Sequence, residues 1–229
     1  QTMRLALALG LAGVGLSTAK ADRRFEAKGT EFDLTGRLVG DQVGTRVAMG
    51  SEGGYLVWQD NATDEFGLGI SALRMDVAGN PVGAPVRINS LLAGDQENPR
   101  VGVLKSGGAI FAWEGGASGF HRVHYRVTNA QGLFLGEDSF VTGPESGEQV
   151  EPALAVLKNG RAVLAWTDYL DDGSVKGVSA RIIGSEGQAL SEPFRLNKFT
   201  LGNQHKAQVV AMPGERFAAA WVSDQQQDD

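Results

Sequence analysis

Acidic and polar side chains gather in two of the loops that follow the four tryptophans of the chain. The candidate ligand contacts are Asp60, Asn61, Asp64 and Glu65 after Trp58, and Asp168, Tyr169, Asp171 and Asp172 after Trp166. Loops that differ between the units of a repeat protein commonly carry its binding site. We therefore expect these two loops to contact an extracellular glycan or a surface protein.

The same carboxylates raise the question of a metal. Ca²⁺ takes about six to eight oxygen ligands, and Asp168, Asp171 and Asp172 offer several within five residues. The sequence lacks an Asp-x-Asp-x-Asp-Gly loop, however, and acidic loops are commonly only solvated. We predict no cofactor and no metal, with calcium at these three residues as the alternative.

Few residues are arranged for catalysis. His121 and His124 are three residues apart, which places them on opposite faces of a strand. No nucleophile elbow, phosphate-binding loop or dinucleotide fingerprint occurs, and the absence of cysteine excludes thiol chemistry and disulfides. A sialidase-like glycoside hydrolase would need paired carboxylates. Its Asp-box places Gly three residues before Trp, whereas Gly160 precedes Trp166 by six.

The loops are positioned by a repeat of about 54 residues. A Gly-x-Gln is followed 16 or 17 residues later by a Trp, and this occurs four times. The glutamines are Gln42, Gln96, Gln149 and Gln204, and the tryptophans are Trp58, Trp113, Trp166 and Trp221. Residues needed identically in every unit are more often architectural than functional. We therefore assign the glutamines to the junctions between units and the tryptophans to the core.

Each unit offers four short apolar segments separated by turn residues. In the second unit they cover residues 86–89, 99–104, 109–113 and 120–127. Four antiparallel strands in about fifty residues is the pattern of a β-propeller blade. Residues 109–113, 162–166 and 217–221 are apolar throughout, which indicates a strand covered on both faces. Tandem β-sandwiches, which need about a hundred residues per domain, rank second.

The chain divides into a leader and an unfinished array. A basic start, an apolar run and an Ala-x-Ala pattern predict a signal peptide at residues 1–21. Residues 22–229 form the repeat domain, with units at about 29–83, 84–136, 137–191 and 192–229. The fourth unit lacks its third strand. We expect a fragment of a larger propeller, the alternative being an irregular four-bladed ring in which residues 32–34 complete the last blade.

The units resemble a known repeat type. One segment reads Phe194-Arg195-Leu196-Asn197 and then Gly202-Asn203-Gln204; another reads Val86-Arg87-Ile88-Asn89 and then Gly94-Asp95-Gln96-Glu97-Asn98-Pro99, followed by Val101, Leu104, Gly107-Gly108 and Trp113. This pattern is similar to the F-x-V-N…G-D-Q repeats of bacterial secreted and cell-surface proteins. The resemblance implies β-propeller units, often beside adhesin-like or calcium-binding modules. The third unit departs from it, with Phe140-Val141-Thr142-Gly143 where an Asn would be and Gly147-Glu148-Gln149 in place of Gly-Asp-Gln.

Function follows from these patterns. A net charge of −6 without a basic cluster argues against a nucleic-acid partner, and the apolar run at the N-terminus is too short to span a membrane. We predict a secreted or cell-surface, non-catalytic binding or adhesion module, joined to other domains of a longer chain. The alternatives are a sialidase-like glycoside hydrolase and a scaffold without a ligand.

Overall fold

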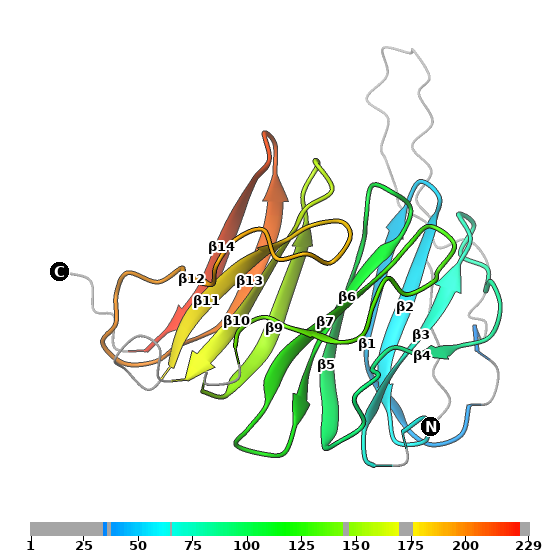
Figure 1. The fold of residues 1–229 in the computed structure, drawn as a ribbon, viewed down its shortest axis with the longest axis horizontal. Coiled ribbons are helices and arrows are strands. Elements are labelled where there is room, and N and C mark those ends of the chain that lie inside the picture. The colour runs from blue at the N-terminus through cyan, green and yellow to red at the C-terminus, as the bar shows by residue number, and fades with distance from the viewer. Residues whose placement is uncertain (1–33, 36–37, 65, 144–146, 170–175, 225–229) are drawn as a thin grey trace, which may run out of the picture.

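The chain folds into antiparallel sheets that stand in a row in sequence order (Figure 1). The computed structural model describes residues 34–35, 38–64, 66–143, 147–169 and 176–224. Within these residues it contains strands and no helix. The signal peptide predicted at residues 1–21 lies outside the described residues and stays a prediction.

Three sheets have four strands each, paired in chain order. The first sheet comprises β1 (Gln42–Gly50), β2 (Gly53–Asp60), β3 (Gly69–Met75) and β4 (Val86–Arg87). The second comprises β5 (Asp95–Val103), β6 (Ala109–Gly116), β7 (Arg122–Thr128) and β8 (Ser139–Phe140). The third comprises β9 (Gln149–Val156), β10 (Ala162–Tyr169), β11 (Lys176–Ile183) and β12 (Phe194–Arg195). In the fourth sheet the structure describes two strands, β13 (Gln204–Met212) and β14 (Arg216–Ser223).

The outer strand of each sheet comes just before the next repeated Gln in the sequence. β4 pairs with β3 through Val86 opposite Ala72, although its residues open the sequence unit 84–136. A sheet therefore starts at the Gln, and its boundaries are shifted by one strand from those of the sequence units. The peptide between β4 and β5 links two neighbouring sheets.

The core lies between the sheets. One cluster joins the first and second sheets through Val57, Ile70 and Trp113. A second joins the second and third through Ile110, Leu164 and Trp166. Because each of β2, β6 and β10 packs between two layers, its residues are buried almost without interruption. The predicted all-β propeller is confirmed, with three complete four-stranded blades and an incomplete fourth.

The fourth sheet differs from the expectation of a strand covered on both faces. In β14 the residues alternate between exposed and half-buried. Phe217 and Trp221 pack against the third sheet, whereas Val222 is 47% exposed. The apolar run at residues 217–221 predicts two covered faces, but among the described residues only the third sheet packs against β14.

The first sheet is covered on its outer face by residues that precede β1. Leu34 and Leu38 pack against Leu56 and Trp58 of β2. Of the segment 32–34, considered above as an outer strand for the last blade, only Leu34 is described. Its contacts place it on the first blade.

The different burial of equivalent tryptophans predicts different costs of truncation. Trp166→Ala should lower the free energy of unfolding by roughly 3–5 kcal/mol, because a fully buried indole leaves a cavity between two sheets. Trp221→Ala should cost clearly less, because that side chain is half-buried. Urea denaturation followed by circular dichroism measures both values. Equal losses for the two variants would contradict this account of the core.

Candidate functional site

The carboxylates that follow Trp58 and Trp166 turn back onto the tryptophans. The indole Nε1 of Trp58 donates to Asp60 Oδ2 at 3.1 Å, and that of Trp166 donates to Asp168 Oδ2 at 3.0 Å. Both aspartates are buried, with 2% and 0% of their surface exposed. Since a buried indole N–H needs an acceptor, each aspartate serves the core of its blade.

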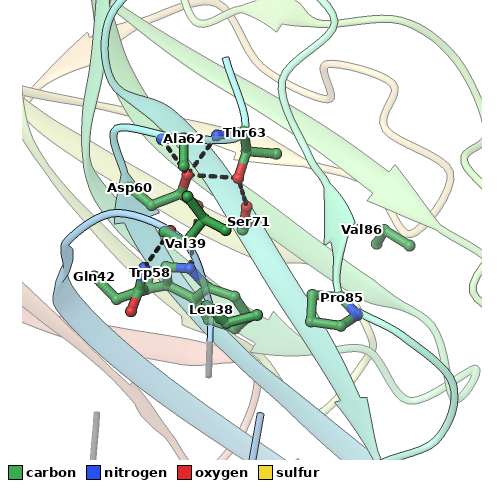
Figure 2. A pocket seen from close by; sticks show the side chains of 10 residues that line it. All are labelled: Leu38, Val39, Gln42, Trp58, Asp60, Ala62, Thr63, Ser71, Pro85 and Val86. Carbon is green, nitrogen blue, oxygen red and sulfur yellow. Dashed lines mark hydrogen bonds between the residues drawn. The ribbon is translucent and has the colours of Figure 1, made fainter. Parts of the chain in front are cut away.

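Figure 2 shows how Asp60 also holds its own loop. Its Oδ1 accepts hydrogen bonds from the backbone N–H groups of Ala62 at 3.0 Å and Thr63 at 2.7 Å. The Thr63 hydroxyl lies 2.5 Å from the same oxygen and 3.0 Å from Ser71 Oγ. Beside them is a pocket of about 180 Å³, whose other lining residues include Leu38, Pro85 and Val86. These bonds occupy both oxygens of Asp60.

The remaining loop candidates are dispersed. Asp64 is buried and accepts from Asn89 Nδ2 at 2.9 Å. Asn61 is exposed and accepts from the backbone N–H of Asp41. Tyr169 lies under the ammonium of Lys176, 4.9 Å from its ring centroid. Glu65, Asp171 and Asp172 lie outside the described residues.

These placements favour a structural role for Asp60, Asp64 and Asp168. Ligand binding by the eight loop residues stays a prediction. Among the described residues, no group of three or more histidine or acidic side chains could hold a metal ion. Calcium at Asp168, Asp171 and Asp172 also stays a prediction, because two of those residues are not described.

The repeated glutamines lie at the junctions between sheets. Gln96 Nε2 donates to the backbone oxygen of Gly94 at 2.8 Å, and its Oε1 accepts from Asn89 Nδ2 at 2.9 Å. Gln204 repeats this arrangement with Gly202 and Asn197. The two asparagines in turn accept the backbone N–H at the same place in the third strand, from Ile70 and Val178. Gln and Asn therefore act as one unit that satisfies buried backbone groups.

The junction between the second and third sheets keeps this unit with different residues. Thr142 replaces the Asn, and Gln149 Nε2 donates to its hydroxyl. Gln149 Oε1 then accepts the N–H of Val123 itself, at 3.3 Å. The departure of the third unit from the repeat pattern thus leaves no unmatched N–H at this position.

A second set of repeated positions runs along the first strands of the sheets, which lie next to one another. Two residues after each Gln the backbone is left-handed, at Gly44, Asn98, Glu151 and Lys206, with φ between 51° and 65°. Pairing with the second strand shifts register at the same place in all four sheets. Such a bulge removes an N–H from the ladder, so that N–H requires another acceptor.

The acceptor comes from the preceding blade, from the residue directly after its Trp. Asn98 N donates to Gln59 Oε1 at 2.9 Å, and Lys206 N donates to Thr167 Oγ1 at 3.2 Å. Between these two junctions, Glu151 N donates to Glu114 Oε2 at 2.5 Å. Each described junction between blades is thus closed by a bulge N–H and a side-chain oxygen.

Glu114 is the buried carboxyl of this row, with 6% of its surface exposed. Its Oε1 accepts from Asn98 Nδ2 at 2.6 Å. Burial raises the pKa of the Glu114 carboxyl above its ordinary value, and the hydrogen bonds from Glu151 and Asn98 oppose that rise. The arrangement keeps a proton on Glu114 to higher pH than on an exposed glutamate.

Glu151 is the neighbouring carboxylate, half-buried and on the next blade. Its Oε2 accepts from the Thr167 hydroxyl at 2.7 Å and from the N–H of Lys206 at 2.9 Å. Glu114 and Glu151, whose carboxyl groups have different surroundings, are thus joined by a hydrogen bond between the second and third sheets, and Glu151 also accepts from the fourth. This row from Gln59 to Lys206 is the candidate site.

The sequence contained a signal for this pair. The residue after each Trp changes from Gln59 to Glu114, Thr167 and Val222, while the Trp is constant. Glu114 lies within β6, just before a loop that begins with the uncharged residues 117–119, and Glu151 lies within β9. Neither residue therefore belongs to an acidic cluster in a loop, the pattern that predicts a binding site in the sequence.

The chain resembles known proteins in its fold. No protein-family model matches the chain, and no curated protein sequence matches it significantly. The chain is similar to an endo-arabinase from Bacteroides thetaiotaomicron, with a TM-score of 0.51 and 16% identity, over 86% of this chain and 76% of that protein. It is similar to an α-L-arabinanase from Penicillium chrysogenum with arabinobiose bound, with a TM-score of 0.52 and 16% identity, over 81% and 58%. It is also similar to a protein of unknown function from Dyadobacter fermentans, with a TM-score of 0.54 and 15% identity, over 75% of this chain and 46% of that protein.

At these identities the likeness establishes the fold and the propeller-like repeats. Two of these neighbours, the endo-arabinase and the arabinanase, are glycoside hydrolases, and this finding corrects the prediction of a non-catalytic binding or adhesion module and of a protein that is not an enzyme. The glycoside hydrolase alternative agrees better with it. No described helix has the length and apolar character that a membrane span needs.

His124 adds a titratable group to the core beside this site. Its ring stacks on Trp113, with centroids 5.6 Å apart and planes 10° from parallel. Burial lowers its pKa to about 4, although the charge of Asp138 acts in the opposite direction. The imidazole is therefore neutral in the folded protein at pH 7, and its burial and its stacking on Trp113 make it part of the core.

The depressed pKa of His124 predicts a loss of stability in acid. Between pH 6.5, its ordinary pKa, and pH 4, the unfolded chain binds a proton that the folded chain does not. The free energy of unfolding should therefore fall by roughly 3 kcal/mol from this group as the pH drops through that window. His124→Phe should remove this part of the decline, as measured by urea denaturation at several pH values. An unchanged slope in the variant would contradict a neutral buried imidazole.

Proposed function

We propose that this chain forms the catalytic propeller of an exported glycoside hydrolase that cleaves an extracellular glycan. The observation that carries the proposal is the pair Glu114 and Glu151, two carboxyl groups from neighbouring blades in unlike surroundings. Hydrolysis of a glycosidic bond commonly uses one carboxyl as acid and a second as base or nucleophile. Enzymes separate the two roles by placing such groups in different environments.

The surroundings suggest which residue has which role. Glu114 is the proton donor, because burial raises its pKa and a protonated carboxyl can protonate the leaving oxygen. Glu151 is the carboxylate that acts on the sugar or on water. Its Oε2 accepts hydrogen bonds from the Thr167 hydroxyl and from the backbone N–H of Lys206.

The aspartates that follow Trp58 and Trp166 are less suited to this role than Glu114 and Glu151. They are Asp60, Asp64 and Asp168, together with Asp171. The first three are buried and bonded to Trp58, Asn89 and Trp166. Changing any of them would disturb a loop or the core and would leave the chemical question unanswered.

The substrate class comes from the neighbours and is part of the proposal. An endo-arabinase and an arabinanase share the fold, so arabinose-containing polysaccharides are the first substrates to test, with sialosides second. Export follows from the signal peptide predicted at residues 1–21. The similarity to repeats of bacterial secreted and cell-surface proteins supports an extracellular glycan as the partner.

Removal of either carboxyl should abolish turnover. Glu114→Gln and Glu151→Gln should each lower the rate of arabinan hydrolysis by roughly 100-fold to 10,000-fold, the usual contribution of general acid or base catalysis. Release of reducing sugar from arabinan and from sialoside reporters measures the rate. Glu186→Gln, at an exposed glutamate of the turn after β11, is the matched control and should keep full activity.

The pH profile gives a second measurement on the same variants. The wild-type rate should fall at high pH, where Glu114 loses its proton, and Glu114→Gln should lose this basic limb. Urea denaturation of each variant separates lost chemistry from lost folding. Absence of turnover by the wild type on all these glycans, or full activity in both Gln variants, would refute the proposal.

A further inference from the structure

A second pocket lies at the C-terminal ends of the first strands, away from Glu114 and Glu151. The hairpins that join β1 to β2, β5 to β6 and β9 to β10 turn at one edge of the molecule, the upper edge in Figure 1. Between them is a pocket of about 400 Å³. From Asn98 to Lys105 the chain advances seven residues, or roughly 20 Å in a strand, so this pocket is separate from Glu114 and Glu151.

The floor of this pocket is apolar and built from three blades. Met49, Val103 and Val156 line it from β1, β5 and β9. Glycines bring these strands close together. A Cβ on Gly50 would lie 2.9 Å from Val103 Cγ1, and one on Gly102 would lie 2.6 Å from Val156 Cγ2. The same close approach thus occurs at two successive junctions and produces a continuous floor.

The rim of the pocket carries two lysines from neighbouring blades. Lys105 and Lys158 occupy the same place in successive hairpins, and both are exposed. Lys105 Cβ lies 3.7 Å from the position of a Cβ on Gly160, in the hairpin of Lys158. Over the part of the chain that the structure describes, no hydrogen bond or ion pair engages either ammonium group. Glu52 is the one acidic residue of the lining.

This placement is notable in a chain with a net charge of −6. The two lysine side chains outnumber Glu52, the single acidic residue of the lining, and a bound anion would lower the repulsion between their charges. The pocket combines the two elements of a site for an acidic sugar, namely an apolar floor for the C–H face of a ring and cations for its carboxylates. Its volume is within the range of sites that hold small ligands.

We propose that this pocket, defined by Met49, Val103, Val156, Lys105 and Lys158, binds a carboxylate-bearing oligosaccharide. The choice of a sugar over a free anion rests on the proposed function. The cationic rim and the apolar floor are features of the structure and do not depend on that function. The site has no part in bond cleavage. It would hold an acidic stretch of a polysaccharide on the face opposite to Glu114 and Glu151.

Binding is measured by isothermal titration calorimetry with trigalacturonate, maltotriose and inorganic phosphate as separate probes. The wild type should bind trigalacturonate, should not bind maltotriose, and should bind phosphate more weakly. Lys105→Gln and Lys158→Gln should each weaken trigalacturonate binding by about threefold to fivefold, the usual scale of an exposed ion pair, and the double variant should weaken it by about tenfold to 25-fold. Added salt should weaken binding by the wild type.

Two controls separate this site from the proposed active site. Lys198→Gln changes the same charge at another exposed lysine and should leave the affinity unaltered. Glu114→Gln and Glu151→Gln should also leave it unaltered, whatever their effect on hydrolysis. No binding by the wild type, full binding by the double lysine variant, or loss of binding in Glu114→Gln would each overturn the assignment. Phosphate binding as tight as that of trigalacturonate would overturn the sugar part in favour of a free anion.

Discussion

The structure depends on burying both faces of the second strand in every complete blade. β2, β6 and β10 are apolar up to the Trp and buried almost without interruption, and such a strand is stable only when layers cover it on each side. This requirement sets the blades face to face and places each Trp against the preceding layer. Where the described residues supply one layer only, in β14, burial alternates along the strand. The blade is therefore a unit whose stability depends on its neighbours.

Close packing of the blades brings backbone groups together at the first strands, and these groups need partners. The bulge two residues after each Gln turns an N–H toward the preceding blade, where Gln59, Glu114 or Thr167 accepts it. The acceptor needs only an oxygen atom, so its residue type can change without loss of the junction. That freedom allows a carboxyl to enter the row at Glu114 and a second at Glu151. The proposed chemistry thus uses positions that have a structural role in every blade but whose residue type differs between blades.

The two ends of the first strands differ in charge. Glu114 and Glu151 lie near the starts of β5 and β9, and Lys105 and Lys158 follow their ends. Each lysine belongs to a hairpin that needs only a turn residue such as glycine, which leaves its neighbours free to vary. A propeller offers two faces on one frame, and here one face carries the proposed pair of carboxyl groups and the other carries two exposed lysines.

Composition and spacing by themselves determine the repeat, the all-β class and the buried second strands, because these depend on local pattern and on the period of the Gln and Trp residues. They also assign Gln and Trp to the frame, since a residue repeated in every unit serves what every unit shares. They do not identify Glu114 and Glu151, which are 37 residues apart in the sequence and belong to different blades. Nor do they reveal that Asp60 and Asp168 belong to β2 and β10 and bond to their own tryptophans, because an aspartate two residues after a Trp has the same sequence pattern whether it is solvated or buried. Only the tertiary structure settles both points, since burial and hydrogen bonding between blades depend on how the sheets pack against one another.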